Sequence, residues 1–431
     1  MTSGDWTALA GFFILFAMMG LRVPIGIAMG LVGVFGFAAI RGLSPALNLL
    51  ASAPVSVITD FNLSLVSFFI LMGVVATNSG MSRELFKAGN AWLGQFRGGL
   101  ALSTIAACAG FAAICGSSVA TAATMTKVAM PEMRRFGYRE EVSSGVVAAG
   151  GTLGILIPPS VVLVVYGYIT ETDVSQLFIA GIVPGILAVA MYMATVLIGH
   201  RKGLPAGTPF NLREAFVSLS GIWAVMLLFV SVIGALYFGV ATPTEAAAVG
   251  AFLTILIGVA RGRLGWRKIT ASLVEALRTS VTVYTILIGA ELFSFFLAIT
   301  QSPQKITTWL IDMNFGSYGT LTLILVLFVL AGCVLDSMAM IILLVPIVFP
   351  VIVQLGFDPI WFGIIIVMTA ELGLITPPVG INVFVINSIA RDVKLTTIFR
   401  GVVPFIVSDV IRLVLLVMFP AIVLFLPMTM K

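Results

Sequence analysis

Long apolar runs follow one another along almost the whole chain. Ile222–Thr242 contains no charged residue, and Leu15–Ala39 is interrupted by a single charge, at Arg22. A helix that crosses the hydrocarbon core of a bilayer needs about 20 mostly apolar residues, whereas a transmembrane β-strand needs only about ten. Helices also satisfy their own backbone hydrogen bonds inside lipid. The pattern therefore predicts an all-α polytopic membrane protein.

Two apolar segments in the first half are short and lie on either side of a small polar tip. They are Leu100–Cys115 and Ser118–Met133, and residues 116–121 read Gly-Ser-Ser-Val-Ala-Thr. Non-helical backbone at membrane depth is tolerated only where protein or a water-filled cavity covers it. The two segments predict a re-entrant helical hairpin at about residues 99–136, which does not cross the membrane.

The next apolar run, Val142–Tyr168, contains Gly154 and Pro158-Pro159 near its middle. Proline lacks a backbone N–H and its ring clashes with the preceding helical turn. The run therefore predicts a discontinuous helix at residues 141–170.

The second half of the chain repeats this design at an offset of 219 residues. Pro158-Pro159 recurs as Pro377-Pro378, and the other matches, without a gap, are Gly154 with Gly373, Gly137 with Gly356, Pro131 with Pro350, Ala120 with Ala339, and Ser118 with Ser337. We therefore predict two repeats, residues 1–200 and 215–431, joined by a cytoplasmic linker at residues 201–214. The second repeat has a hairpin at about residues 318–355 and a broken helix at residues 359–390.

Each repeat has five predicted crossings, an odd number, so the two repeats are predicted to be inverted relative to each other. The distribution of basic residues supports this topology. With the N-terminus outside, eighteen of the 23 Lys and Arg residues fall in joints on the cytoplasmic side. The joints on the outer side contain only Arg41, Lys305 and Lys431, and this difference agrees with the positive-inside rule. Both termini are expected outside the cytoplasm.

Shorter segments between the spans are predicted to lie along the membrane surface. Ser82–Phe96 has Leu85, Trp92 and Leu93 on one helical face and charged residues off it, as an interfacial helix does. A similar amphipathic piece surrounds Ile306–Met313. Trp266–Arg278 is interpreted as a surface stretch that precedes a separate span, Thr279–Ile299.

Composition and motifs narrow the class further. Hydrophobic residues make up 60% of the 431 residues and charged residues 10%, against about 45–50% and 25% in soluble domains. The net charge of +5 reflects orientation in the membrane and does not suggest nucleic-acid binding, and the three Cys lie in apolar segments. No phosphate-binding loop, His-Glu-x-x-His or Gly-x-Ser-x-Gly motif occurs. The chain is not expected to be an enzyme or to hydrolyse ATP.

Inverted repeats with broken helices are typical of secondary transporters, whose ion and substrate sites lie at the repeat interface. Unwound carbonyls can coordinate Na⁺, and a hairpin tip adds hydroxyls and a helix N-terminus that attracts anions. One cation site is predicted at residues 116–121 and 154–159, and a second at Asp336, Ser337, Gly373, Thr376 and Pro378. The alternative is that these small residues merely allow helices to pack closely.

A second hypothesis is an intramembrane enzyme or sensor that uses Asp336 and Glu371 as an acid–base pair. The repeat argues against it, because the equivalent residues in the first half are Ser117 and Thr152. Asp409 and Arg412, three residues apart on the last span, are interpreted as a structural ion pair. Glu291 is interpreted as a helix–helix contact.

Several motifs together resemble the large membrane subunit of tripartite ATP-independent periplasmic (TRAP) transporters. They are Gly116-Ser117-Ser118-Val119-Ala120-Thr121-Ala122-Ala123, Pro131-Glu132-Met133, residues 150–160 (Gly-Gly-Thr-Leu-Gly-Ile-Leu-Ile-Pro-Pro-Ser), residues 241–246 (Ala-Thr-Pro-Thr-Glu-Ala) and Thr376-Pro377-Pro378-Val379-Gly380. The resemblance covers nearly the whole chain. It implies an elevator-type fold, Na⁺-coupled symport, and uptake of a small organic anion across the bacterial inner membrane.

The resemblance also implies partners. A periplasmic substrate-binding protein delivers the substrate in this family, and a small four-helix membrane subunit accompanies the large one. Because the chain begins at the large subunit's first span, the small subunit is expected to be a separate polypeptide. A stand-alone Na⁺-coupled anion transporter of a related elevator family is the alternative.

Carried over residue by residue, the resemblance assigns the ion and substrate sites. The first Na⁺ site falls on Ser117, Ser118, Gly154, Ile157 and Pro159, and the second on Ser337, Gly373, Thr376 and Pro378. The substrate is expected within reach of Ser118, Thr121, Asp336, Thr376 and Asn382. Asp336 suits an anionic substrate poorly, so it is assigned to the cation or to capping the second arm of its hairpin.

Overall fold

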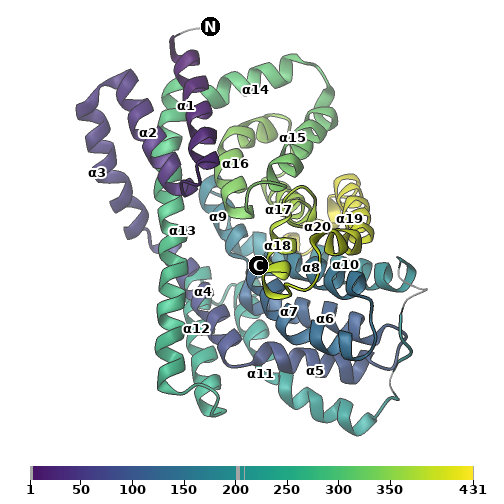
Figure 1. The fold of residues 1–431 in the computed structure, drawn as a ribbon. Helices are drawn as coiled ribbons and strands as arrows, with labels where there is room; N and C mark the ends of the chain where they lie inside the picture. The colour runs from purple at the N-terminus through teal and green to yellow at the C-terminus, as the bar shows by residue number, and fades with distance from the viewer. Residues whose placement is uncertain (1–2, 200–203, 208, 431) are drawn as a thin grey trace.

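The computed structural model describes residues 3–199, 204–207 and 209–430, and every regular element within these ranges is helical. Eight of the described helices are long and apolar enough to cross a membrane, and several others, such as α6 and α15, are apolar but shorter. The predicted all-α membrane architecture is confirmed (Figure 1). Of the predicted linker at residues 201–214, residues 201–203 and 208 lie outside the described ranges.

The first half of the chain contains the elements in the predicted order. The helices are α1 (Ser3–Gly20), α2 (Ile25–Arg41), α3 (Leu43–Thr59), the short η1 (Phe61–Leu63), α4 (Ser64–Asn78) and α5 (Met81–Leu93). The hairpin follows as α6 (Gly99–Cys115) and α7 (Ser118–Arg135), and the interrupted helix as α8 (Glu140–Leu156) and α9 (Val161–Thr170). The long α10 (Val174–Gly199) completes the half.

The second half has a similar order of elements, with one long helix, α13, where the first half has α3 and α4. It begins with α11 (Leu212–Tyr237), α12 (Pro243–Ala260), α13 (Trp266–Thr300) and α14 (Ser302–Asp312). The second hairpin is α15 (Gly316–Gly332) with α16 (Ser337–Gln354), and the second interrupted helix is α17 (Pro359–Ile375) with α18 (Ile381–Ile389). The chain ends with α19 (Leu395–Met418), α20 (Ala421–Leu424) and η3 (Pro427–Thr429).

Two boundaries differ from the sequence prediction. The surface stretch and the separate span predicted between Trp266 and Ile299 form one continuous helix of 35 residues, α13. The prediction was wrong because the change from amphipathic to apolar composition near Arg278 brings no proline, and a helix accommodates both compositions. The end of the predicted linker is also helical, since the Asn211 side chain caps α11 by accepting the N–H groups of Arg213 and Glu214.

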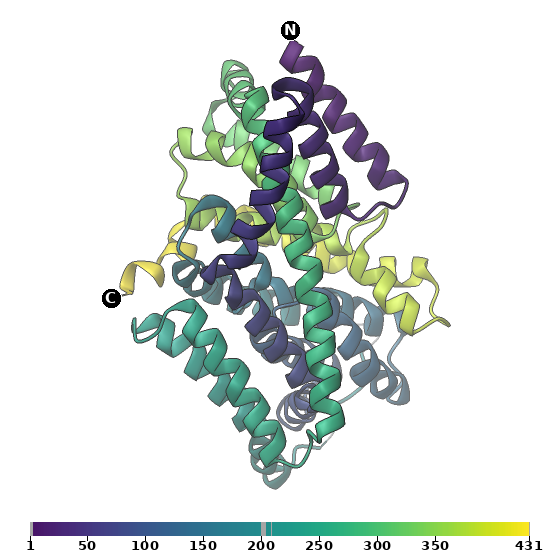
Figure 2. The ribbon, with the colours of Figure 1, turned by 90° about the vertical axis from the view of Figure 1, so that its left-hand side faces the viewer.

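The helices form two packed groups. In one, α13 runs along the side of the molecule against α2, α3 and α4, and α12 packs on α4 (Figures 1 and 2). In the other, the hairpins and interrupted helices pack together with α10 and α19, through pairs such as α7 with α8, α8 with α19 and α15 with α17. The predicted ion and substrate residues all belong to the second group.

The amphipathic helices α5 and α14 each contact both groups. In Figure 1 they lie crosswise to α13, near its opposite ends. α5 packs on α6 of the hairpin and on α11, and α14 packs on α16 and α13. Glu84 of α5 forms ion pairs with Arg261 at 2.8 Å and with Arg263 at 2.6 Å. Both arginines lie between α12 and α13, so these ion pairs link α5 to the first group.

The predicted topology can be tested with single cysteines. Ala206 is exposed in the described part of the linker, and Ser317 is exposed where the second hairpin begins, on the predicted outer side. Ala206→Cys is expected to react with an impermeant maleimide only after the membrane is opened, and Ser317→Cys in intact cells. The native Cys108, Cys115 and Cys333 are buried, so they are not expected to react with the maleimide.

Gly207 is unsuitable for this test because a side chain there would collide with the Gln95 carbonyl. Labelling of Ala206→Cys from outside in intact cells, with Ser317→Cys labelled only after opening, would contradict the predicted orientation. Labelling of both cysteines from the same side would contradict the inverted-repeat topology.

Candidate functional site

The first hairpin turns sharply between α6 and α7. Gly116 ends α6 with a φ of 61°, in the left-handed region that favours glycine. Ser117 is extended, and its hydroxyl caps α7 by accepting the Ala120 N–H at 3.3 Å. The turn therefore presents the N-terminal end of α7 together with two serine hydroxyls.

The first interruption separates α8 from α9 and frees backbone carbonyls. Pro158 and Pro159 have no N–H, so the carbonyls of Gly154 and Ile155 lose their α-helical partners. The Ser160 hydroxyl replaces one partner by donating to the Ile155 carbonyl. No such replacement is found in the described residues for the carbonyl of Gly154, which makes it a candidate ligand for a cation. The Pro158-Pro159 peptide bond is cis, as is Pro377-Pro378.

The hairpin tip and the interruption are in direct backbone contact. A Cβ at Gly154 would lie 2.5 Å from the Ser117 carbonyl oxygen and 2.9 Å from the Ser118 nitrogen, so only glycine permits this approach. Gly116 is similarly close to the Pro159 carbonyl. The structure thus brings Ser117, Ser118, Gly154 and Pro159 together, whereas the Ile157 side chain turns away and packs against Gly185 of α10.

The second hairpin and interruption are arranged more loosely. Gly373 contacts Gly332 at the end of α15, where a Cβ would lie 2.6 Å from the Gly332 carbonyl carbon. The Gly373 carbonyl accepts the Thr376 N–H at 3.2 Å, and the Thr376 hydroxyl donates to the Leu372 carbonyl at 2.6 Å. Pro377 and Pro378 are exposed, whereas Pro158 and Pro159 are buried.

The two hairpin tips also differ in length. Residues 333–336 separate α15 from α16, whereas only residues 116 and 117 separate α6 from α7. Asp336 caps α16 through a 3.1 Å hydrogen bond from the Ala339 N–H. This is one of the two roles that the sequence suggested for Asp336. Ser337 is the first residue of α16. Its backbone is not among the nearest neighbours of Gly373, whereas the backbone of Ser118 is among those of Gly154.

Among the predicted substrate residues, Ser118 and Asn382 lie together although they come from different halves. The Asn382 amide donates to the Ser118 hydroxyl at 2.8 Å, and the hydroxyl also lies 3.0 Å from the amide oxygen. The amide lies 3.3 Å from the Ala148 carbonyl as well. Thr121 lies one turn away and donates to the Ser117 carbonyl at 2.8 Å. In this conformation neither Asp336 nor Thr376 makes a hydrogen bond with this pair.

A buried charged cluster lies between the two interrupted helices. Arg412 contacts Asp409 at 2.9 Å, which confirms the predicted ion pair, and also Glu371 at 2.7 Å. The sequence prediction missed this second contact, because it joins α19 to α17 across 41 residues of chain. The hypothesis of an Asp336–Glu371 pair finds no support, since the hydrogen bonds of Glu371 go to Arg412 and Asp336 caps α16.

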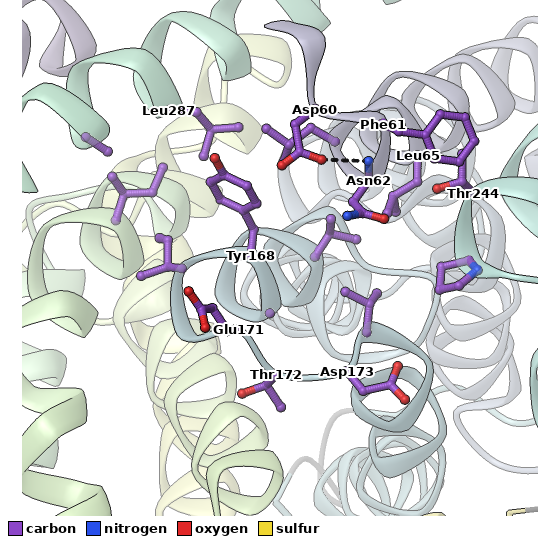
Figure 3. Close-up of a pocket in the computed structure, with 18 of the residues that line it drawn as sticks. Asp60, Phe61, Asn62, Leu65, Tyr168, Glu171, Thr172, Asp173, Thr244 and Leu287 are labelled. Atoms are coloured by element: carbon purple, nitrogen blue, oxygen red, sulfur yellow. Dashed lines mark hydrogen bonds between the residues drawn. The ribbon is translucent and has the colours of Figure 1, made fainter. Parts of the chain in front are cut away.

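A pocket of about 980 Å³ opens elsewhere, between the two helix groups (Figure 3). Its lining includes Asp60, Glu171, Asp173 and Glu291 and no lysine or arginine. Glu291, interpreted from the sequence as a helix contact, therefore borders an open space. None of the predicted ion or substrate residues lines this pocket, and its charge is unfavourable for an anion.

No group of three or more His, Cys, Asp and Glu side chains that could hold a metal ion occurs within the described residues. The residues predicted to hold Na⁺ offer hydroxyl and carbonyl oxygens, together with the carboxylate of Asp336. Hard cations accept such ligands.

Comparison with a solved structure supports the fold. The crystal structure of the YdaH transporter of Alcanivorax borkumensis matches with a TM-score of 0.64 over 88% of this chain and 89% of that chain, at 14% sequence identity. At this identity the likeness concerns the fold alone.

Comparison of sequences shows the family. Residues 12–422 match the family described as "Tripartite ATP-independent periplasmic transporter, DctM component". The C4-dicarboxylate TRAP transporter large permease protein DctM of Pseudomonas aeruginosa is 38% identical over 399 residues, 90% of this chain and 93% of that protein. The isethionate TRAP transporter permease protein DctMQ of Oleidesulfovibrio alaskensis is 34% identical over 97% of this chain and 65% of that protein. This chain is therefore a multi-pass inner-membrane protein that belongs to the DctM component family of TRAP transporters.

Proposed function

We propose that this protein carries out Na⁺-coupled uptake of a small organic anion that a periplasmic substrate-binding protein delivers. A small four-helix membrane subunit is the second proposed partner. The family supports this proposal, and the relatives described above are named for a dicarboxylate and for isethionate, both small organic anions. The substrate class follows from what those two names share.

The contact between the first hairpin tip and the first interruption carries the Na⁺ part of the proposal. There Gly154, whose carbonyl is deprived of its helical partner, lies with its Cα against the backbone of Ser117 and Ser118. We assign the first Na⁺ to Ser117, Ser118, Gly154, Ile157 and Pro159, with Ile157 contributing its carbonyl. Neutral ligands suit a transported ion, because they leave no fixed charge unpaired when the ion departs.

The second Na⁺ is assigned to Ser337, Gly373, Thr376 and Pro378. Pro377 and Pro378 are exposed at the surface of the protein in this conformation, unlike Pro158 and Pro159 at the first site. The Thr376 hydroxyl donates to Leu372, which leaves its oxygen lone pairs available to a cation.

The substrate is assigned to the space near Ser118, Thr121, Asp336, Thr376 and Asn382. Asn382 and Ser118 supply neutral donors beside the N-terminal end of α7, where a carboxylate is favoured. Asp336 contributes as the cap of α16 and as a partner for the cation. It does not serve as a ligand of the anion.

Transport is proposed to follow an elevator mechanism, in which the group that contains both hairpins moves against the group around α13. The separation of the helices into two groups and the position of α5 and α14 between them support this proposal. The two crosswise helices would act as arms that follow the moving group.

Reconstitution tests the proposed function as a whole. Proteoliposomes that contain this chain, the small subunit and the binding protein are expected to take up one of a panel of labelled dicarboxylates, keto acids, sialic acids and sulfonates. Uptake should require an inward Na⁺ gradient and the binding protein. Equal uptake without the binding protein would favour a stand-alone transporter, and uptake indifferent to Na⁺ would refute the coupling.

Removing one side-chain oxygen at each break tests the Na⁺ sites. Thr376→Val and Ser118→Ala each deprive a buried cation of a partner, at a cost of about 1–3 kcal/mol. The Na⁺ concentration for half-maximal uptake is expected to rise about five- to hundredfold, and saturating Na⁺ should restore much of the rate.

The matched controls make the same chemical change in α17, the helix that ends beside Thr376, and in α6, the other arm of the hairpin that contains Ser118. Thr369→Val removes a hydroxyl that donates to the Ile365 carbonyl in α17, and Ser103→Ala one that donates to the Gly99 carbonyl in α6. Both controls should keep the normal Na⁺ dependence. If Thr376→Val and Ser118→Ala behave like their controls, the assigned sites are wrong.

Locking the two helix groups tests the elevator mechanism. Asp60 and Thr172 line the pocket in Figure 3 from different groups. A short bifunctional maleimide that links Asp60→Cys to Thr172→Cys is expected to abolish uptake while substrate still protects the protein against thermal unfolding. Each single cysteine treated with the same reagent is the control. Full uptake by the linked protein would rule out the movement.

A further inference from the structure

Five buried side chains form a continuous polar network across the helix group that contains the hairpins. Thr152 of α8 lies 3.1 Å from the Tyr192 hydroxyl of α10, which donates to Asp409 of α19 at 2.9 Å. Arg412 of α19 then joins Asp409 to Glu371 of α17. All five side chains are at most 2% exposed.

The network reaches both interrupted helices at equivalent positions. Thr152 and Glu371 are separated by 219 residues, the offset of the repeat, and each precedes by two residues the glycine of its break. With a rise of about 1.5 Å per residue, Glu371 lies about 7.5 Å along the helix axis from Thr376. Glu371 is therefore close to the second proposed Na⁺ site, and the network reaches the first through Thr152, without either residue belonging to a site.

The cluster contains more acidic than basic side chains. Two buried carboxyl groups, of Glu371 and Asp409, face one guanidinium, that of Arg412. Arg412 already has a partner in Asp409 on its own helix, so Glu371 is not needed to neutralise it. One Glu371 oxygen, Oε1, is buried and makes no hydrogen bond within the described part of the chain.

A second carboxylate in such a place calls for an explanation. Charged groups at membrane depth are costly and usually functional. The equivalent position in the first half holds the neutral Thr152, which joins the network through a hydroxyl. A neutral residue thus suffices to connect an interrupted helix to the network, and the charge of Glu371 serves some other purpose.

We propose that Glu371 and Asp409 are both ionised when Na⁺ is bound, and that the resulting excess negative charge of the Glu371–Asp409–Arg412 cluster stabilises Na⁺ at the two helix breaks from a distance. Apart from the carboxylate of Asp336 at the second site, the proposed ligands are neutral oxygens, so most of the charge that balances the bound ions has to come from outside the ligand shell. Glu371 is then a positioning residue that sets cation affinity without touching the ion. This inference rests on the Na⁺ part of the proposed function.

The expected size of the effect follows from Coulomb's law. A unit charge at about 10 Å in a medium of effective dielectric constant about 20 changes the affinity for a monovalent cation by about tenfold. Glu371→Gln keeps the shape of the side chain and an oxygen that can accept from Arg412, and it removes only the charge. We expect it to raise the Na⁺ concentration for half-maximal uptake about tenfold, with little change in substrate affinity at saturating Na⁺.

Two further variants separate charge from structure. Asp409→Asn also removes one negative charge, from a different helix, and is expected to weaken Na⁺ binding in the same direction. It keeps the proposal testable if Glu371→Gln does not fold. Thr152→Val breaks the hydrogen bond to Tyr192 without changing any charge, and it should leave the Na⁺ dependence within about twofold of the unmodified protein.

The experiment measures the Na⁺-dependent rise in melting temperature of the purified protein, and Na⁺-dependent uptake in proteoliposomes. The proposal is overturned if folded Glu371→Gln or Asp409→Asn responds to Na⁺ as the unmodified protein does. It is also overturned if Thr152→Val shifts the Na⁺ dependence as much as they do, since the network would then act only as a structural clamp. An unmodified protein that ignores Na⁺ would instead refute the proposed function.

Discussion

An interrupted helix inside a bilayer exposes backbone carbonyls that lipid cannot satisfy, and the rest of this structure depends on that constraint. Each Pro-Pro pair removes two N–H groups from a helix that is otherwise buried, α8 in the first half and α17 in the second. The freed carbonyls have to meet a polar partner. In the first half the Ser160 hydroxyl supplies one for the Ile155 carbonyl, and the turn at Gly116 and Ser117 brings the polar backbone of the hairpin tip against the break.

Glycine allows the interrupted helix to approach the hairpin more closely than any other residue would. Gly154 lets the backbone of α8 approach the Ser117 carbonyl more closely than any side chain allows, and Gly373 does the same for α17 and the end of α15. Small residues commonly allow close contact between helices in membranes. Here they also bring backbone carbonyl oxygens of the hairpins close to the interrupted helices. Close packing and ion binding, which the sequence analysis treated as alternatives, are compatible at these positions.

The two halves share an order of elements but differ in detail, and the differences concern charge and access. The first break is buried and covered by its hairpin, and its neighbour Thr152 is neutral. The second break is exposed at Pro377 and Pro378, and its neighbour Glu371 is charged and paired with Arg412. Asn382 then ties the second interrupted helix to the first hairpin tip through Ser118. The candidate site is therefore a joint product of both halves.

The sequence by itself determined the helical membrane architecture, the two hairpins and the two interruptions, because apolar length and proline act locally on the backbone. It also led to the Asp409–Arg412 pair, since residues three apart on a helix are neighbours. It did not reveal the unbroken α13, because no local signal separates an amphipathic stretch from the apolar span that continues it. Only the tertiary structure brought Glu371 to Arg412 and Asn382 to Ser118, and only it distinguished the covered break from the open one. Those contacts depend on how helices far apart in the chain pack against one another, which the spacing of residues along one helix does not record.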